Sequence, residues 1–138
     1  MQSTNVKKRR LLDSFAVLAW LQDEDGAEKV EALLLTARRE QSPLLITLIN
    51  LGEIYYQVAR QQGHPFAQGV IRQVKALPIE LCPCDEDLAL RAAKIKADFP
   101  MAYADAVAVA AAQREEATVI TGDPEFKKVE HLIPVEWI

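Results

Sequence analysis

Residues 101–121, "MAYADAVAVAAAQREEATVIT", contain the two patterns that decide the fold of this chain. The alanine-rich part predicts a helix over 102–115, because alanine has the highest helix propensity. The β-branched run after it predicts a strand over 117–121. Asp105 is the one charged residue among residues 101–112. Burying an isolated carboxylate is unfavourable, so the surroundings of Asp105 should explain why it is there.

The same alternation of short β-type runs and longer helical runs extends along the whole chain. Further strands are expected over 9–13, 44–47, 78–82 and 133–137, and helices over 14–22, 26–40, 48–62, 66–76 and 85–98, with a short helical turn over 124–129. Repeated alternation of this kind favours a mostly parallel sheet with helices on both faces. We therefore expect an α/β fold, a three-layer α/β/α sandwich, formed by one domain over 1–138.

Composition excludes several classes of protein. Half of the 138 residues are hydrophobic and 26% are charged, as in an ordinary globular domain rather than a disordered chain. The uncharged stretches are too short to cross a bilayer, and the apolar run after "KKRR" is interrupted by Asp13 and followed by no cleavage signal. We expect a cytoplasmic protein. The net charge of −4 argues against nucleic-acid binding by bulk electrostatics alone.

Cysteine and histidine give little support to a zinc site. Cys82 and Cys84 flank Pro83, with no second Cys or His pair at ligand spacing, so we expect reduced thiols. His64 and His131 are isolated in the sequence. Carboxylates are therefore the better candidates for chemistry.

Four acidic residues stand out by their context. Asp13 ends the first expected strand and Asp123 follows the strand over 117–121, while Glu53 lies within "LINLGEIYY" and Asp105 within the alanine-rich helix. In open parallel sheets, ligands bind beyond the carboxyl ends of the strands. These residues also have simpler interpretations: Asp13 and Asp123 as helix N-caps, Asp105 as a first-turn cap, and Glu53 as part of a solvated helix stripe.

A cluster of these acids would require a compensating positive charge. Two carboxylates about 4 Å apart repel by about 4 kcal/mol at a surface-like dielectric constant. Protonation, a basic partner or a hard divalent cation would relieve that repulsion, and carboxylate oxygens suit Mg²⁺ or Mn²⁺. A carboxylate-bound Mg²⁺ with open water positions is typical of phosphoryl chemistry.

The segments "LLDSFAVLAWL", "NLGEIYY", "AYADAVAVAAA" and "TGDPEF" resemble, in order and approximate spacing, the four acidic segments of the PIN-domain ribonucleases, especially VapC-type toxins of VapBC toxin-antitoxin pairs. The resemblance covers nearly the whole chain and implies a five-stranded sheet in the order 3-2-1-4-5. It makes Asp13, Glu53, Asp105 and Asp123 the catalytic, metal-coordinating acids. Thr121 becomes a hydrogen-bonding neighbour of the last segment. Phe15 departs from the pattern, because many relatives have a small polar residue there.

The resemblance also implies an activity and partners. A PIN-domain ribonuclease hydrolyses RNA with Mg²⁺ or Mn²⁺ and leaves a 5′-phosphate and a 3′-hydroxyl. VapC-type toxins are usually homodimers that a small antitoxin protein silences. Asp13 and Asp105 would then be the firmest metal ligands, with Glu53 and Asp123 completing the pocket directly or through water.

Residues that would contact RNA are harder to assign. The basic run Lys7–Arg10 and the pairs Arg38/Arg39, Lys94/Lys96 and Lys127/Lys128 are candidates for phosphate contacts, or else ordinary solvated charges. Tyr55, Tyr56 and Tyr103 are candidates for stacking on bases, or else for packing in the interior.

Two other functions remain open at the level of sequence. A non-catalytic PIN-like module would capture a basic peptide of a partner in the acidic pocket. A phospho-acceptor receiver domain fits less well, because no clear acceptor ends the strand over 78–82 and no lysine follows the last strand.

Overall fold

The computed structural model describes residues 8–138 and has a five-stranded, all-parallel sheet in the order β3-β2-β1-β4-β5. Lys7, one of the candidate RNA contacts, lies outside the described residues. The strands are β1 (Arg9–Leu12), β2 (Leu44–Thr47), β3 (Ile79–Cys82), β4 (Ala117–Thr121) and β5 (Val135–Trp137). The predicted α/β class and the strand order 3-2-1-4-5 are confirmed.

Helices follow the strands in the predicted sequence. They are α1 (Ser14–Leu21), α2 (Ala27–Glu40), α3 (Leu48–Gln62), α4 (His64–Lys75), α5 (Glu86–Asp98) and α6 (Tyr103–Glu115), with the 3₁₀ helix η1 (Pro124–Val129). Most boundaries lie within one residue of the prediction. The helix α4 begins two residues earlier than predicted, because Pro65 occupies its first turn rather than preceding it. The strand β5 begins at Val135 rather than at residue 133.

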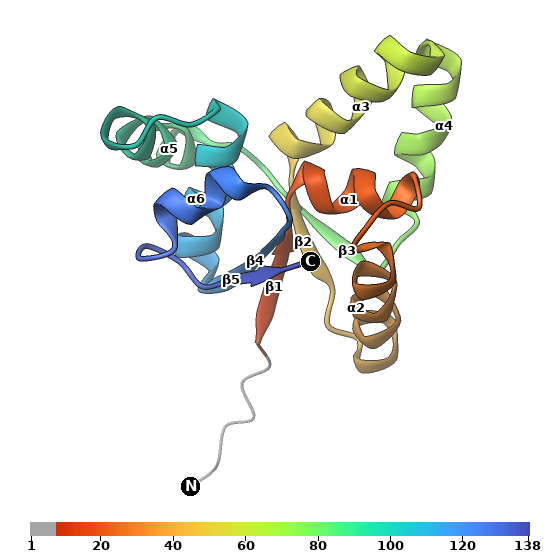
Figure 1. The fold of residues 1–138 in the computed structure, drawn as a ribbon, viewed down its shortest axis with the longest axis horizontal. Coiled ribbons are helices and arrows are strands. Elements are labelled where there is room, and N and C mark those ends of the chain that lie inside the picture. Colours follow the sequence, from red (N-terminus) through yellow and green to blue (C-terminus); the bar gives the residue numbers. More distant parts are fainter. Residues whose placement is uncertain (1–7) are drawn as a thin grey trace, which may run out of the picture.

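Both faces of the sheet are covered by helices (Figure 1). Successive strand residues point to opposite faces, so Leu11 joins the core beneath α5 and α6 while Leu12 joins the core beneath α1 to α4. Val119 and Ile120 divide between the same two cores. The strands β2 and β4 are buried along their whole length, because helices cover both faces of the sheet there.

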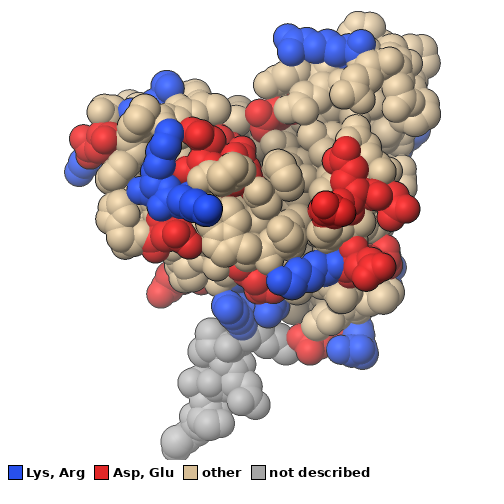
Figure 2. All heavy atoms as spheres, viewed as in Figure 1, with Lys and Arg blue, Asp and Glu red and all other residues tan. Residues whose placement is uncertain are grey.

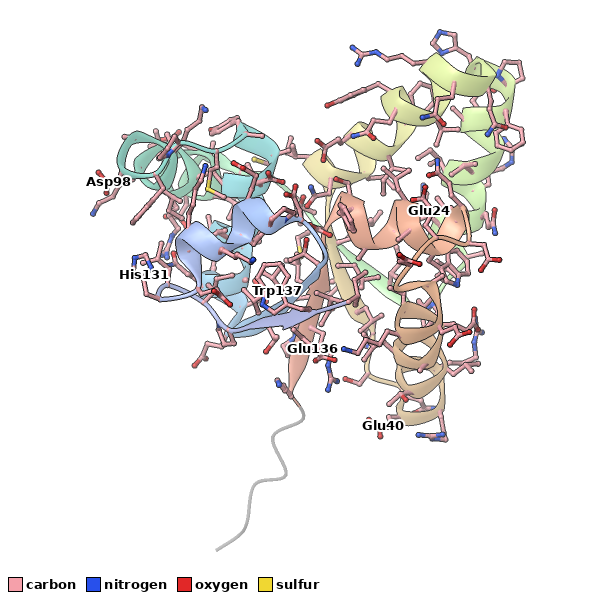
Figure 3. The ribbon with its side chains drawn as sticks, in the orientation of Figure 1. Glu24, Glu40, Asp98, His131, Glu136 and Trp137 are labelled. Carbon is pink, nitrogen blue, oxygen red and sulfur yellow. The ribbon has the colours of Figure 1, made fainter. Side chains whose placement is uncertain are left out.

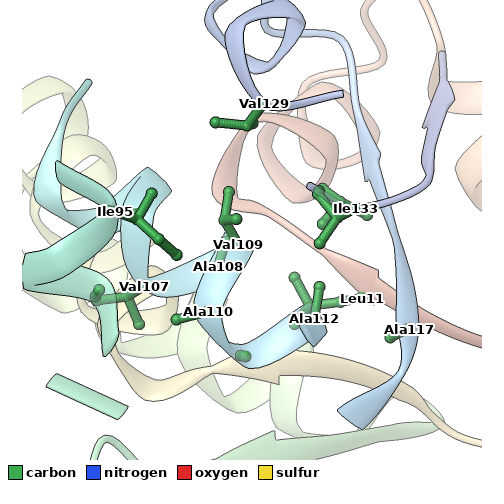
Figure 4. Packing of buried hydrophobic residues seen from close by; sticks show 14 of the residues in the cluster. Leu11, Ile95, Val107, Ala108, Val109, Ala110, Ala112, Ala117, Val129 and Ile133 are labelled. Carbon is green, nitrogen blue, oxygen red and sulfur yellow. The ribbon is translucent and has the colours of Figure 1, made fainter. Parts of the chain in front are cut away.

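The helix α6 is buried almost all round. Residues 105–112 are all buried, and all of them except Asp105 are alanines or valines that belong to one hydrophobic core (Figure 4). Small side chains allow the helix axis to approach the sheet closely. The first turn of α6 therefore lies near the carboxyl ends of β1 and β4. Among residues 8–138, no helix is both long and apolar enough to span a bilayer.

Replacing Ala110 with leucine should destabilise the fold. Ala110 is fully buried in α6, and three added carbon atoms have no space in a close-packed core. We expect Ala110→Leu to lower the free energy of unfolding by about 1–3 kcal/mol in urea denaturation. Gln113→Leu, at an exposed position of the same helix, is the control and should have little effect. Equal stability of the two variants would contradict this description of the core.

Candidate active site

A pocket of about 450 Å³ opens at the carboxyl ends of β1 and β4, a size typical of ligand sites. Figure 2 shows acidic side chains in the hollow between the α5 and α6 side of the molecule and the α1 and α3 side. Six of the twelve lining residues are acidic, and none of the lining residues is basic. The lining consists of Asp13, Ser14, Phe15, Leu18, Gln22, Glu24, Glu53, Gln57, Ala102, Asp105, Asp123 and Glu125.

Asp13 joins β1 to α1 and is 1% exposed. Its Oδ1 accepts a hydrogen bond of 2.8 Å from the backbone N–H of Ala16, so it is the N-cap of α1. Its Oδ2 accepts a hydrogen bond from the hydroxyl of Thr121, at the end of β4. Burial nevertheless raises the pKa of Asp13 to about 7, because the two hydrogen bonds only partly offset desolvation. Asp13 is therefore both the N-cap of α1 and a residue of the pocket.

Thr121 also holds Asp123 in place. Its Oγ1 accepts a hydrogen bond of 2.9 Å from the backbone N–H of Asp123. Asp123 in turn caps η1, because its Oδ1 accepts a hydrogen bond of 3.0 Å from the backbone N–H of Glu125. One buried hydroxyl thus connects the ends of β1 and β4.

Glu53 reaches the pocket from the first half of α3 and is half-buried there. Its Oε1 accepts hydrogen bonds from the Ser14 hydroxyl and from Nδ2 of Asn50, the latter at 3.4 Å. Asn50 is fully buried and is itself fixed by Thr47. Glu53 is therefore not part of a solvated stripe. Ser14 and Asn50 are not among the predicted site residues, although the position of Asn50 one helical turn before Glu53 is a usable signal.

Asp105 differs from the other three acids. It is 8% exposed, and its carboxylate accepts no hydrogen bond from any group of residues 8–138. The N-cap of α6 is Ala102, so Asp105 is not a capping residue. Burial raises the pKa of Asp105 to about 7, and the charges of Asp123, Glu53 and Glu125 add to this effect. Its carboxylate is thus the group in the pocket that most needs a partner.

The donor set of the pocket suits a hard divalent cation. Six carboxylates from separate parts of the chain line it, and none of the lining residues offers a positive charge. Within residues 8–138, no three His, Cys, Asp or Glu side chains are spaced to bind one ion together. Direct binding by one or two carboxylates, with water linking the ion to the others, fits this arrangement, as is usual for Mg²⁺.

The predicted RNA contacts are scattered. Arg9 and Arg10 lie at the amino end of β1, about 10 Å of strand from Asp13. Arg9 pairs with Glu115 at 2.6 Å, and Arg10 Nε lies 3.2 Å from a carboxylate oxygen of Glu136 on β5 (Figure 3).

Two lysines lie closer to the pocket. Lys128 Nζ is 2.8 Å from Oε1 of Glu125, a lining residue, and Lys96 Nζ donates to the carbonyl of Met101 just before α6. None of the three tyrosines lines the pocket. The Tyr103 hydroxyl donates to the Ala89 carbonyl instead.

Removing the Thr121 hydroxyl should destabilise the strand ends. In Thr121→Val, Asp13 loses a buried donor and the N–H of Asp123 loses its acceptor. We expect the free energy of unfolding to fall by about 1–3 kcal/mol, measured by urea denaturation. Thr121→Ser keeps the hydroxyl and should retain most of the stability. If serine and valine were equally destabilising, the methyl group rather than the hydrogen bonds would be responsible.

Stability without divalent cations should fall as pH rises. The pKa values of Asp13 and Asp105 are raised to about 7 in the folded protein, against about 3.9 for an unfolded aspartate. The folded state binds more protons, so their contribution is full below about pH 4 and is lost as pH rises through about 7. In EDTA, we expect the free energy of unfolding to decrease between about pH 5 and pH 8.

Asp105→Asn should reduce that decrease and make the protein more stable at about pH 8, by about 1–3 kcal/mol. The exposed Asp25→Asn removes one carboxylate elsewhere and is the control for net charge. An Asp105→Asn protein with the same pH dependence as the wild type would show that Asp105 is not repelled in the fold.

Solved structures with similar folds include several toxin-antitoxin proteins. A DNA-bound VapBC from Salmonella typhimurium matches with a TM-score of 0.73 and 17% identity, covering 95% of this chain and 98% of that chain. VapBC2 from Rickettsia felis matches with a TM-score of 0.71 and 16% identity, covering 94% and 98%. VapC20 from Mycobacterium tuberculosis, a sarcin-ricin loop cleaving toxin, matches with a TM-score of 0.65 and 16% identity, covering 86% and 92%.

No curated protein matches the sequence. A family model does, and the match runs over most of the described chain. The model of the PIN domain matches residues 10–132, from β1 to beyond η1, and the match includes Asp13, Glu53, Asp105 and Asp123. The chain therefore belongs to the PIN-domain family.

Proposed function

We propose that this protein is a divalent-metal-dependent endoribonuclease and the toxin of a toxin-antitoxin pair. The observation that carries the proposal is the pocket itself, where Asp105 has a raised pKa and no hydrogen-bond partner among residues 8–138, and no basic residue lines the walls. Membership of the PIN-domain family and the fold shared with VapC-type toxins support the nuclease assignment.

The four acids would hold Mg²⁺ or Mn²⁺, with Asp13 and Asp105 as the direct ligands. When bound, the ion neutralises the phosphate and makes a coordinated water more acidic. Glu53 and Asp123 lie on the other walls of the pocket, where their carboxylates accept hydrogen bonds from the attacking water and orient it.

Thr121 is a positioning residue, because it donates to Asp13 and fixes the backbone of Asp123. In the reaction, the water oxygen bonds to phosphorus while the bond to the 3′ oxygen breaks. The water gives up a proton and the departing 3′ oxygen takes one up, so the products are a 5′-phosphate and a 3′-hydroxyl.

An antitoxin partner and a homodimer belong to the same proposal. Several proteins of similar fold were solved as VapBC complexes, including one from nontypeable Haemophilus influenzae. An acidic pocket with no basic residue in its lining is also complementary to a cationic side chain of a partner. If this capture were the whole function, the protein would bind a basic partner but neither take up Mn²⁺ nor cut RNA.

Asp105→Asn should lower RNA cleavage at least about 100-fold, because the change removes a charged ligand but little volume. The measurement is single-turnover cleavage of total RNA and of synthetic single-stranded RNA in Mn²⁺, with EDTA as the chemical control. Asp25→Asn is the matched variant, since it makes the same substitution at an exposed residue outside this pocket. Undiminished cleavage by a folded, pure Asp105→Asn protein would contradict the proposal.

A further inference from the structure

Phe15 is the one aromatic residue that lines the acidic pocket, and it lies beside the two acids that end β1 and β4. It is 42% exposed, although its neighbours Ala16 and Val17 are buried in the core beneath α1. Phe15 itself belongs to neither hydrophobic core. Packing of the interior therefore does not explain a large apolar side chain at this position.

The ring of Phe15 is seated against the backbone at Gly122. A Cβ atom on residue 122 would lie 2.5 Å from Cε1 of Phe15, and 3.1 and 3.2 Å from Cζ and Cδ1. The first separation is too short for carbon atoms, so a side chain at residue 122 would displace the Phe15 ring from its place. The φ angle of Gly122 is not positive, unlike those of Gly26 and Gly63, so the backbone conformation does not itself require glycine. The close approach of the Phe15 ring accounts for the glycine at position 122.

The charge of the pocket limits how RNA can be held there. Six acidic residues line it and no basic residue does, so the phosphates of RNA meet repulsion close to the reacting bond. The nucleobases are the uncharged part of the substrate. A fixed aromatic ring can bind a base by stacking without any charge, and such contacts tolerate any base.

We propose that Phe15 is the stacking platform for a nucleobase next to the scissile phosphate. This inference rests on the proposed ribonuclease function and adds the residue that positions a base of the substrate. The contact with Gly122 holds the ring in place, and the ring in turn positions the base beside Asp13 and Asp123. The tyrosines do not take this role, because they lie outside the pocket lining and the Tyr103 and Tyr55 hydroxyls are bonded elsewhere.

The first test measures RNA binding separately from cleavage. Proteins carrying Asp105→Asn would be titrated in Mn²⁺ with an oligoadenylate of about twelve nucleotides and with an abasic ribose-phosphate oligomer of the same length. Adding Phe15→Leu should weaken oligoadenylate binding about 5- to 100-fold, the range expected for one stacked base, and leave binding of the abasic oligomer unchanged. Phe66→Leu, at an exposed phenylalanine of α4 outside the pocket, is the matched control and should change neither.

A second measurement covers the case in which Phe15→Leu does not fold. Phe15→Trp keeps an aromatic face at this position. Oligoadenylate should quench the fluorescence of this variant more than it quenches the wild type, which has only Trp20 and Trp137.

Binding of Mn²⁺ is the control for a Phe15→Leu protein that folds. It should be the same as in the wild type, because phenylalanine offers no ligand atom.

The outcomes separate the two proposals. If Phe15→Leu left the affinity for oligoadenylate unchanged, or weakened binding of the abasic oligomer equally, the stacking inference would be overturned while cleavage by the wild type kept the ribonuclease function. A wild-type protein that neither binds nor cuts RNA would overturn both.

Discussion

The burial of two carboxylates, Asp13 and Asp105, beside the carboxyl ends of β1 and β4 is the constraint on which the rest of the structure depends. Asp13 is almost fully buried, and burial raises its pKa to about 7 despite two hydrogen bonds. An isolated charge in such a place would be costly. The surrounding polar groups limit that cost: the N-terminus of α1 binds one oxygen of Asp13, and Thr121 binds the other.

Asp105 meets the same constraint in another way. The alanine-rich helix carries it to the pocket because small side chains let α6 lie close to the sheet. No donor among residues 8–138 reaches its carboxylate, while burial and, to a lesser extent, three other acids raise its pKa. The fold thus restrains Asp13, Glu53 and Asp123 by hydrogen bonds and leaves Asp105 open to a ligand. This difference between the four acids arises from their partners, since all four carry the same functional group.

Most of the fold could be predicted from the sequence, because short β-type runs alternate with longer helical runs along the chain. The strand over 117–121, for example, contains four β-branched residues and no charged one, and all five of its residues are buried. The four candidate acids could also be identified, since strand ends and a single charge in an apolar helix can be recognised in the sequence. Ser14, Asn50 and the contact between Phe15 and Gly122 could not, because each depends on how distant elements meet. Arg9 and Arg10 are candidate RNA contacts in the sequence, but in the fold they form ion pairs with Glu115 and Glu136. Those partners are distant in the sequence and could not be predicted from it.

The acidity of the chain is itself a consequence of the pocket. Six of the 20 acidic residues line it, and without them the 16 lysines and arginines would outnumber the remaining acids. The net charge of −4 therefore does not describe a surface that repels RNA everywhere. Much of it lies in the pocket, beside which Lys96 and Lys128 lie on the α5 and η1 side. Repulsion falls off over about 10 Å at moderate ionic strength. In the proposed function, these lysines would therefore attract the RNA backbone while a cation and the Phe15 ring act within the pocket.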